Sequence, residues 1–221
     1  MPFGLVIFDC DGVLVDSEPI VNRAHAATLA ACGCPIDERE LLERFCGVSD
    51  KDMLAVIERD AGRLLPADYA DRVSAIVARD YRRSLRAIDG VAAVLAAISM
   101  PVCVASSGVM AQIRRGLDAT GLAPYFADNL FSASMVARGK PAPDLFLYAA
   151  NRMSVAPPRC VVVEDSVPGV AAALAAGMTA IGFTGGSHCR PGHDLRLAAQ
   201  GAAAVVEHMD DLLPALARLR A

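Results

Sequence analysis

Short apolar runs that recur along the chain, separated by longer stretches of helical periodicity, constrain its fold more than any other feature. The runs cover residues 4–8, 102–105, 160–163, 179–183 and 203–206. An unbroken apolar run of this length is typical of a parallel strand that is buried on both faces. Helical patterns occupy residues 91–98, 110–120, 143–153, 168–176 and 209–219. Strands that alternate with helices predict an α/β fold, a doubly wound parallel sheet with helices on both faces in three layers.

One stretch departs from this alternation. Between Ser17 and Arg86 the sequence has helical periodicity only, with helices expected at residues 18–31, 38–44, 51–61 and 67–85. Because this stretch directly follows the first expected strand, it is interpreted as an insertion into the α/β core. We predict two domains: an α/β core of residues 1–16 and 87–221, and a helical cap domain of residues 17–86. Hinges are expected at residues 16–17 and 87–90.

Composition and charge narrow the classes of function. The net charge of −4 and the pI near 5.5 provide no basic field for binding nucleic acid. The longer apolar stretches, at residues 91–105 and 167–183, are interrupted by proline or glycine and fall short of the ~20 residues of a membrane span. The first residues lack the basic leader of a secretory signal. We therefore expect a cytoplasmic protein that binds neither nucleic acid nor membrane. The sequence carries no signal of its oligomeric state, for which a monomer is the default expectation.

Polar side chains follow three of the expected strands at their carboxyl ends. They are Asp9, Asp11, Ser106, Ser107, Glu164 and Asp165. The carboxyl ends of parallel strands meet at one edge of a sheet, where ligands bind in the crevice, and Lys140 precedes a helix in a neighbouring loop. Carboxylate and hydroxyl oxygens, without clustered thiols or imidazoles, favour Mg²⁺ over zinc. The sequence therefore predicts a magnesium site at this edge of the sheet.

The same residues carry a resemblance to a known family. The segment FDCDGVLVDS at residues 8–17 resembles the first motif of the haloacid dehalogenase-like superfamily, Ser106 its second, Lys140 its third, and Glu164-Asp165 its fourth. Their order and separation match over essentially the whole chain. The helical insertion after the first motif is similar to the type 1 cap of that superfamily. The resemblance implies an enzyme, a phosphoric monoester hydrolase that uses Mg²⁺.

The resemblance also implies a role for each site residue. Asp9 is implied to attack phosphorus and form an aspartyl-phosphate, with Asp11 as general acid and then general base. Ser106, Ser107 and Lys140 are implied to bind the phosphoryl group. The implied ligands of Mg²⁺ are Asp9, Asp11 through its backbone carbonyl, Glu164 and Asp165. The expected substrate is a small phosphorylated metabolite, a sugar phosphate or a sugar-acid phosphate.

Alternative functions stay open at this point. A phosphosugar mutase resembling β-phosphoglucomutase is the nearest, because residues 46–49 and 16–17 are similar to that enzyme's cap loop and hinge, although Val21 and Asp50 stand where the mutase has a histidine and an arginine. A more diffuse resemblance links the chain to bacterial 6-phosphogluconate phosphatase-like proteins. Arg23, Arg44 and Lys51 would present cations to a sugar acid or form a solvated helix face. A non-catalytic phospho-accepting or metabolite-binding protein is the alternative of another class.

Residues 185–193, GGSHCRPGH, hold two histidines and a cysteine close together. They are interpreted as a surface loop after a strand, because no further soft ligand completes a metal site. His25 and His208 are expected to be packed or solvated rather than catalytic.

Overall fold

A parallel sheet of six strands forms the centre of the molecule. The computed structural model describes residues 3–45, 48 and 50–219. The strands are β1 (Leu5–Phe8), β2 (Val102–Ser106), β3 (Leu130–Ser132), β4 (Cys160–Glu164), β5 (Thr179–Phe183) and β6 (Ala204–Val206). Their order in the sheet is β3-β2-β1-β4-β5-β6. The predicted α/β fold is confirmed, with β3 as an added strand whose three residues are too few for an apolar run to stand out.

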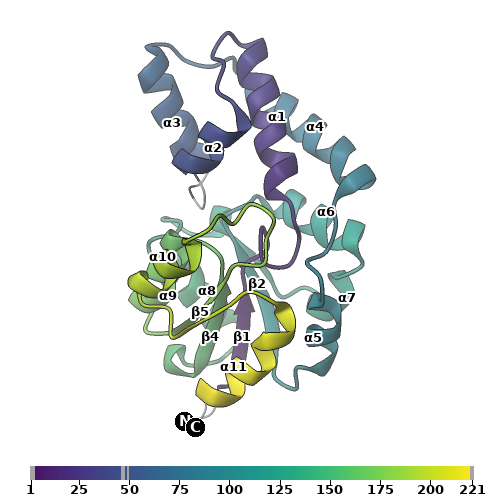
Figure 1. Ribbon diagram of the computed structural model, residues 1–221, viewed down its shortest axis with the longest axis vertical. Helices are drawn as coiled ribbons and strands as arrows, with labels where there is room; N and C mark the ends of the chain where they lie inside the picture. Colours follow the sequence, from purple (N-terminus) through teal and green to yellow (C-terminus); the bar gives the residue numbers. More distant parts are fainter. Residues whose placement is uncertain (1–2, 46–47, 49, 220–221) are drawn as a thin grey trace.

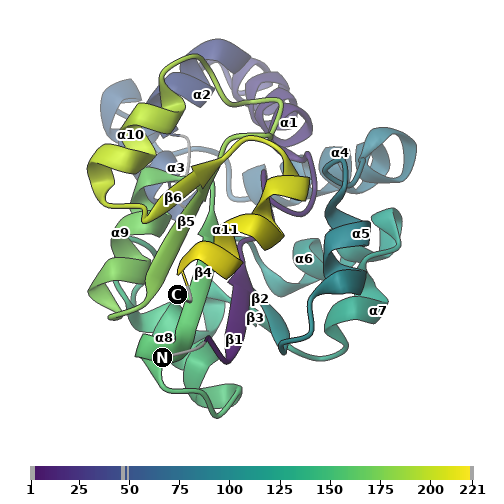
Figure 2. The ribbon, with the colours of Figure 1, turned by 60° about the horizontal axis from the view of Figure 1, so that its bottom comes forward.

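Helices cover both faces of the sheet (Figure 2). One face carries α5 (Val91–Ala97), α6 (Met110–Thr120), α7 (Ala123–Phe126) and α11 (Leu212–Leu219), and the other carries α8 (Asp144–Arg152), α9 (Val167–Ala175) and α10 (His193–Gln200). The side chains of β1 alternate between two buried clusters: Val6 and Phe8 join the first, Leu5 and Ile7 the second. Alternation across a strand buried on both sides produces the three predicted layers.

Most predicted helices match the observed ones to within two residues. Short 3₁₀ turns form η1 (Ala133–Met135), η2 (Pro157–Arg159) and η3 (Met209–Asp211), so the helix expected at 209–219 divides into η3 and α11. The helices α7 and α10 were not predicted. The segment that contains α10 is glycine-rich and polar before His193, which favoured the interpretation as a loop.

Four further helices stand beyond the carboxyl end of the sheet (Figure 1). They are α1 (Glu18–Ala31), α2 (Glu38–Phe45), α3 (Asp50–Ala61) and α4 (Tyr69–Ser84). The two segments that join them to the core run side by side, because Asp16 N–H donates to the Arg86 carbonyl at 2.9 Å and Ile88 N–H to the Leu14 carbonyl at 2.9 Å. The exact division into core and cap domains at residues 16/17 and 86/87 stays a prediction.

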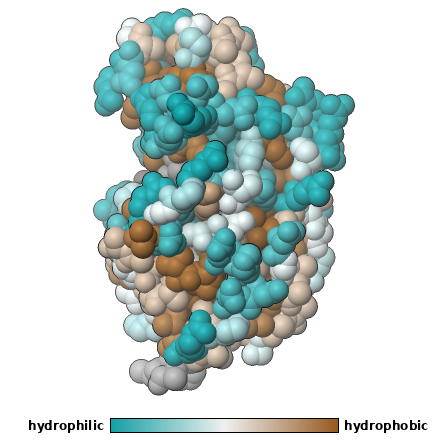
Figure 3. Space-filling model, in the orientation of Figure 1, coloured by the Kyte–Doolittle hydropathy of each residue, from teal (hydrophilic) through white to brown (hydrophobic). Residues whose placement is uncertain are grey.

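A membrane-spanning helix must be long and apolar over its surface. In the part of the chain that the structure describes, no helix is long and apolar enough to cross a membrane. Figure 3 shows hydrophilic side chains over much of the visible face, with hydrophobic ones in separate small patches. These patches are normal for a folded protein, whose surface is never covered by polar atoms alone.

The strand order determines where a ligand site can form. From β1 the chain proceeds to β2 and β3 on one side of the sheet, and afterwards to β4, β5 and β6 on the other. At such a reversal, the connections leave in opposite directions and open a crevice outside the carboxyl ends of the central strands. In this chain the crevice lies beyond Phe8 of β1 and Glu164 of β4.

Candidate active site

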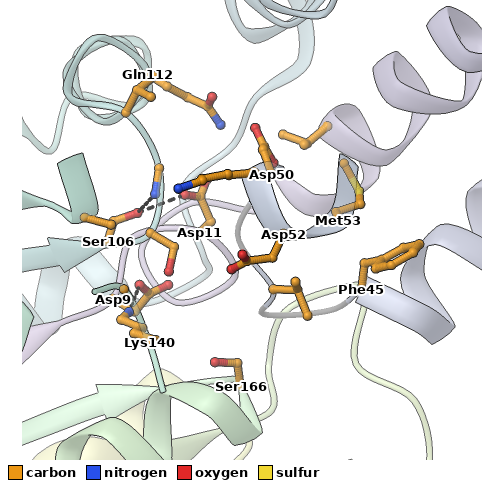
Figure 4. A pocket seen from close by; sticks show the side chains of 18 of the residues that line it. Asp9, Asp11, Phe45, Asp50, Asp52, Met53, Ser106, Gln112, Lys140 and Ser166 are labelled. Carbon is orange, nitrogen blue, oxygen red and sulfur yellow. Dashed lines mark hydrogen bonds and ion pairs between the residues drawn. The ribbon is translucent and has the colours of Figure 1, made fainter. Parts of the chain in front are cut away.

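A cavity of about 670 Å³ occupies this crevice, between the sheet and the helices α1, α2 and α3. In Figure 4 the labelled side chains of the core face Asp50 and Asp52 of α3 across it. All seven residues that the sequence singled out line this cavity. They are Asp9, Asp11, Ser106, Ser107, Lys140, Glu164 and Asp165.

Lys140 joins two of the carboxylates. Its Nζ atom lies 2.5 Å from Asp9 Oδ1 and 2.6 Å from Glu164 Oε1, and it also donates to the Ala105 carbonyl at 3.0 Å. All three charged side chains are buried. An ammonium group has three N–H donors, and each has an acceptor here. Lys140 therefore occupies a fixed position between β1, β2 and β4.

Both carboxylate oxygens of Glu164 have hydrogen-bond partners within the protein. Its Oε2 atom accepts hydrogen bonds from Ser166 N at 2.9 Å and Ser166 Oγ at 2.8 Å, while Oε1 contacts Lys140. A Cβ atom at Gly169, in the first turns of α9, would lie 1.9 Å from both Cδ and Oε1 of Glu164. Only glycine leaves room for this carboxylate, so the start of α9 is shaped to hold Glu164 against Lys140.

Asp11 is held from both sides by hydroxyl groups. Ser17 Oγ donates to Asp11 Oδ1 at 2.5 Å, and Ser106 Oγ donates to Oδ2 at 3.3 Å. Gly12 follows with φ +81. This backbone conformation turns the chain away from the strand direction, and residues other than glycine rarely adopt it. Ser17, which the sequence placed at the end of the first motif and at the hinge, is thus also a contact of Asp11. Ser107 lines the cavity with a partly exposed side chain.

The interpretation of residues 185–193 as a surface loop is wrong for its two histidines. His188 and His193 are both buried, and both contact Asp165. His188 Nε2 lies 2.9 Å from Asp165 Oδ2, and His193 Nε2 contacts the Asp165 backbone carbonyl. The polar, glycine-rich sequence hid the burial, because the partner of each histidine lies far away in the chain.

The wall of the cavity opposite the sheet comes from α1 to α3. His25 is buried there and its Nδ1 atom pairs with the Tyr69 hydroxyl at 2.9 Å, a packed role as expected. Of the three cations considered for a sugar acid, Lys51 lines the cavity, whereas Arg44 pairs with Glu40 and Asp60 outside it. The loop at residues 46–49, compared with the mutases, lies outside the described residues except for position 48.

The sequence model of the family described as haloacid dehalogenase-like hydrolase matches residues 3–177. The chain belongs to this family. The family resemblance on which the expected site rested is therefore confirmed, and the order of its four motifs corresponds to the observed ends of β1, β2 and β4 and the loop at Lys140.

Several relatives of the chain are named as phosphatases. The chain is 37% identical over 187 residues to the 6-phosphogluconate phosphatase of Escherichia coli, covering 84% of this chain and 85% of that one. It is 34% identical over 179 residues to the fructose-1-phosphate phosphatase YqaB of the same organism, covering 80% and 94%. The predicted enzyme class, a phosphatase, is confirmed by the family and these relatives.

A solved structure agrees with the fold. A haloacid dehalogenase-like hydrolase from Deinococcus radiodurans, determined with bound phosphate and sodium, superposes with a TM-score of 0.77 at 34% identity. The match covers 98% of this chain and 96% of that one.

Burial and neighbouring charges shift the pKa values of the site residues in this hydrolase. Burial raises the pKa of Asp9 well above its usual value; Lys140 opposes that shift and the neighbouring carboxylates add to it. The pKa of Asp11 is also raised, mainly by burial, against the hydrogen bonds from Ser17 and Ser106. Burial opposes the charged form of Lys140, but Asp9 and Glu164 outweigh it and raise its pKa. Four carboxylates at the strand ends of the core thus line the cavity with one buried cation among them, an arrangement that favours a further positive charge.

Proposed function

We propose that this chain is a Mg²⁺-dependent phosphatase that hydrolyses the phosphate monoester of a sugar or sugar acid through an aspartyl-phosphate on Asp9. The observation that carries the proposal is the buried contact between Lys140 and the Asp9 carboxylate at the cavity floor, beside Asp11 and Ser106. This arrangement supplies a fixed nucleophile, a cation and a proton carrier within one cavity.

Asp9 is the proposed nucleophile. Lys140 engages its Oδ1 atom, so Oδ2 is the oxygen that can reach phosphorus. In the first step a bond forms between this oxygen and phosphorus, and the bond from phosphorus to the leaving oxygen breaks. The positive charge of Lys140 opposes the rise in the pKa of Asp9 that burial causes, and it stabilises the negative charge that spreads over the phosphoryl oxygens.

Asp11 is the proposed proton carrier. A carboxyl with a raised pKa keeps its proton at a higher pH than usual, which suits a general acid that protonates the leaving oxygen. In the second step Asp11 takes a proton from the water that attacks the aspartyl-phosphate, releasing phosphate and restoring Asp9. Ser17 and Ser106 hold the carboxylate in place through both steps.

The residues present fit Mg²⁺. The proposed ligands are the carboxylates of Asp9 and Asp165 and the backbone carbonyl of Asp11, which are the hard oxygen donors that Mg²⁺ prefers. Among the described residues, no three His, Cys, Asp or Glu side chains form a ready-made metal site. Mg²⁺ does not require one, since one or two carboxylates with water and substrate phosphate usually hold it. When bound, it would neutralise charge on the phosphoryl group and the carboxylates.

Glu164 has a different proposed role. Both of its oxygens are hydrogen-bonded, Oε1 to Lys140 and Oε2 to Ser166. We therefore assign Glu164 to the positioning of Lys140, with Asp165 as the acidic ligand from this strand end.

The proposed substrate class follows from the relatives, which are named for 6-phosphogluconate and fructose 1-phosphate. Hydrolysis is favoured over mutase activity because Val21 and Asp50, which replace the mutase histidine and arginine, both line the cavity. An apolar and an anionic side chain there cannot replace a proton-transferring imidazole or a phosphate-binding guanidinium.

Phosphate release tests the proposal. Purified protein is assayed with p-nitrophenyl phosphate and with a panel of sugar phosphates, sugar-acid phosphates and nucleotides, in Mg²⁺, in EDTA and in Ca²⁺, beside Asp9→Asn. We expect turnover in Mg²⁺, none in EDTA, and little in Ca²⁺ because its coordination is larger and looser. Full activity in EDTA, or in Asp9→Asn, would contradict the proposal.

A further inference from the structure

Two buried histidines hold Asp165 from different directions. The His188 imidazole contacts the side chain, with Nε2 2.9 Å from Oδ2, and the His193 imidazole contacts the backbone carbonyl of the same residue. His188 lies in the segment between β5 and α10, His193 is the first residue of α10, and the mechanism above uses neither of them. Two of the four histidines in the chain thus converge on one aspartate.

Two glycines, Gly12 and Gly186, leave the space in which His188 contacts Asp165. A Cβ atom at Gly12 would lie 1.9 Å from Asp165 Oδ2 and 2.7 Å from His188 Cε1. A Cβ atom at Gly186 would lie 2.8 Å from both Cε1 and Nδ1 of His188. Glycine on both sides lets the imidazole approach the carboxylate, and any side chain at either position would displace it.

The hydrogen-bond partners of His193 indicate which of its ring nitrogens carries the hydrogen. Arg196 contacts His193 Nδ1 at 2.9 Å, and a guanidinium group has donors only. Nδ1 is therefore the acceptor, so Nε2 carries the hydrogen and donates to the Asp165 carbonyl. The orientation of the His193 imidazole is thus fixed at both nitrogens.

The segment is also tied to the chain that leads into α1. Ser187 donates to Asp16 Oδ1 from its backbone nitrogen at 3.1 Å and from its hydroxyl at 2.8 Å. His188 follows directly in the chain, so its position is fixed by an anchor on one side and by Asp165 on the other.

We propose that His188 and His193 are positioning residues that orient Asp165 as a ligand of Mg²⁺. With Oδ2 engaged by His188, Oδ1 is the oxygen with which Asp165 would hold the cation. The inference rests on the proposed function, because it concerns the metal site of that mechanism. Groups that hydrogen-bond a metal ligand fix its orientation, and their loss typically costs about 10–100-fold in metal affinity.

The test compares substitutions of His188 that keep or remove the N–H donor. His188→Leu fills similar space without a donor, whereas His188→Gln retains one near the position of Nε2. The exposed His208 supplies the matched control, His208→Leu. Mg²⁺ binding is measured by calorimetric titration of the full chain without substrate, and p-nitrophenyl phosphate turnover is measured against Mg²⁺ concentration.

We expect His188→Leu to bind Mg²⁺ about 10–100-fold more weakly than wild type and to recover most of its kcat when Mg²⁺ is raised accordingly. His188→Gln should stay within about threefold of the wild-type affinity, and His208→Leu should equal wild type. If His188→Leu does not fold, Gly186→Ala replaces it, since its methyl group displaces the imidazole, and the same weakening is expected.

Two results would overturn the inference while leaving the proposed function intact. One is a folded His188→Leu, or Gly186→Ala in its place, that binds Mg²⁺ as tightly as wild type. The other is a loss of turnover that no concentration of Mg²⁺ restores. If the wild type binds Mg²⁺ but releases phosphate from no substrate, the proposed function is wrong, and the calorimetric comparison alone decides the inference. A wild type that binds no Mg²⁺ overturns both.

Discussion

The ammonium nitrogen of Lys140 lies 2.5 Å from the carboxylate of Asp9, although the two residues are 131 positions apart in the chain. The same nitrogen contacts Glu164 at 2.6 Å, and all three groups are buried. Removal of one partner from such a cluster leaves a buried charge without compensation. Lys140 therefore connects the stability of the fold with the chemistry of the cavity.

Substitution of Lys140 by methionine should destabilise the metal-free protein by about 3–5 kcal/mol, because Asp9 and Glu164 lose their cation in a buried site. The free energy of unfolding is measured by urea denaturation in EDTA. Arg72→Met is the control, since Arg72 pairs with Asp68 on the surface and exposed ion pairs contribute little to stability. Equal losses in the two variants would show that the buried cluster does not stabilise the fold.

Gly169→Ala should lower both stability and turnover. The new methyl group would lie 1.9 Å from Glu164, so the carboxylate must move and release Lys140. Overpacking of this kind costs about 1–3 kcal/mol, and we expect at least a tenfold fall in kcat/KM. The control is Gly116→Ala in α6, where the nearest atoms are 3.7 Å away and the gain in helix propensity makes the change neutral or favourable. Wild-type turnover in Gly169→Ala would refute the role of Glu164.

Glu18 should make the stability of the metal-free protein depend on pH. Burial raises its pKa from 4.5 to about 7, and the carboxylates of Asp11, Asp165 and Asp50 act in the same direction against His188. Between these values the folded state keeps a proton that the unfolded state has lost. This contribution to stability is therefore greatest below pH 4.5 and is lost as the pH rises to about 7.

Glu18→Gln removes that loss. Relative to wild type, the variant should gain on the order of 2 kcal/mol in the free energy of unfolding between pH 5 and pH 8, measured by urea denaturation in EDTA. The exposed Glu38, which also begins a helix, supplies the control Glu38→Gln, for which no such gain is expected. A difference between Glu18→Gln and wild type that is constant across this range would contradict the account.

Strands and helices that produce a local pattern of apolar residues could be predicted from the sequence. The apolar runs that precede Asp9 and Ser106 located β1 and β2, and helical periodicity located α1 and α6 with their observed bounds. Contacts between residues that are far apart in the chain could not be predicted in this way. The position of Lys140 in a neighbouring loop placed it near the crevice, and the family resemblance implied its role. Nothing near it in the sequence indicates that it contacts Asp9 and Glu164.

The two histidines illustrate the same limit. The polar composition around His188 predicts an exposed loop, whereas its burial depends on Asp165 and on the absence of side chains at Gly12 and Gly186. Likewise, the adjacent acids Glu164 and Asp165 are equivalent in sequence. Only their partners, Lys140 and His188, separate their proposed roles.

Trapping of the phosphoryl group on Asp9 tests the central claim most directly. Asp11→Asn keeps the shape of the side chain but removes the acid and base, and p-nitrophenolate leaves without protonation. With p-nitrophenyl phosphate and Mg²⁺, this variant should release one equivalent of p-nitrophenol in a burst and then stall about 10²–10⁴-fold below wild type. Peptide mass mapping after an acid quench should find the phosphoryl group on Asp9. A label on any other residue, or wild-type turnover by Asp11→Asn, would contradict the account.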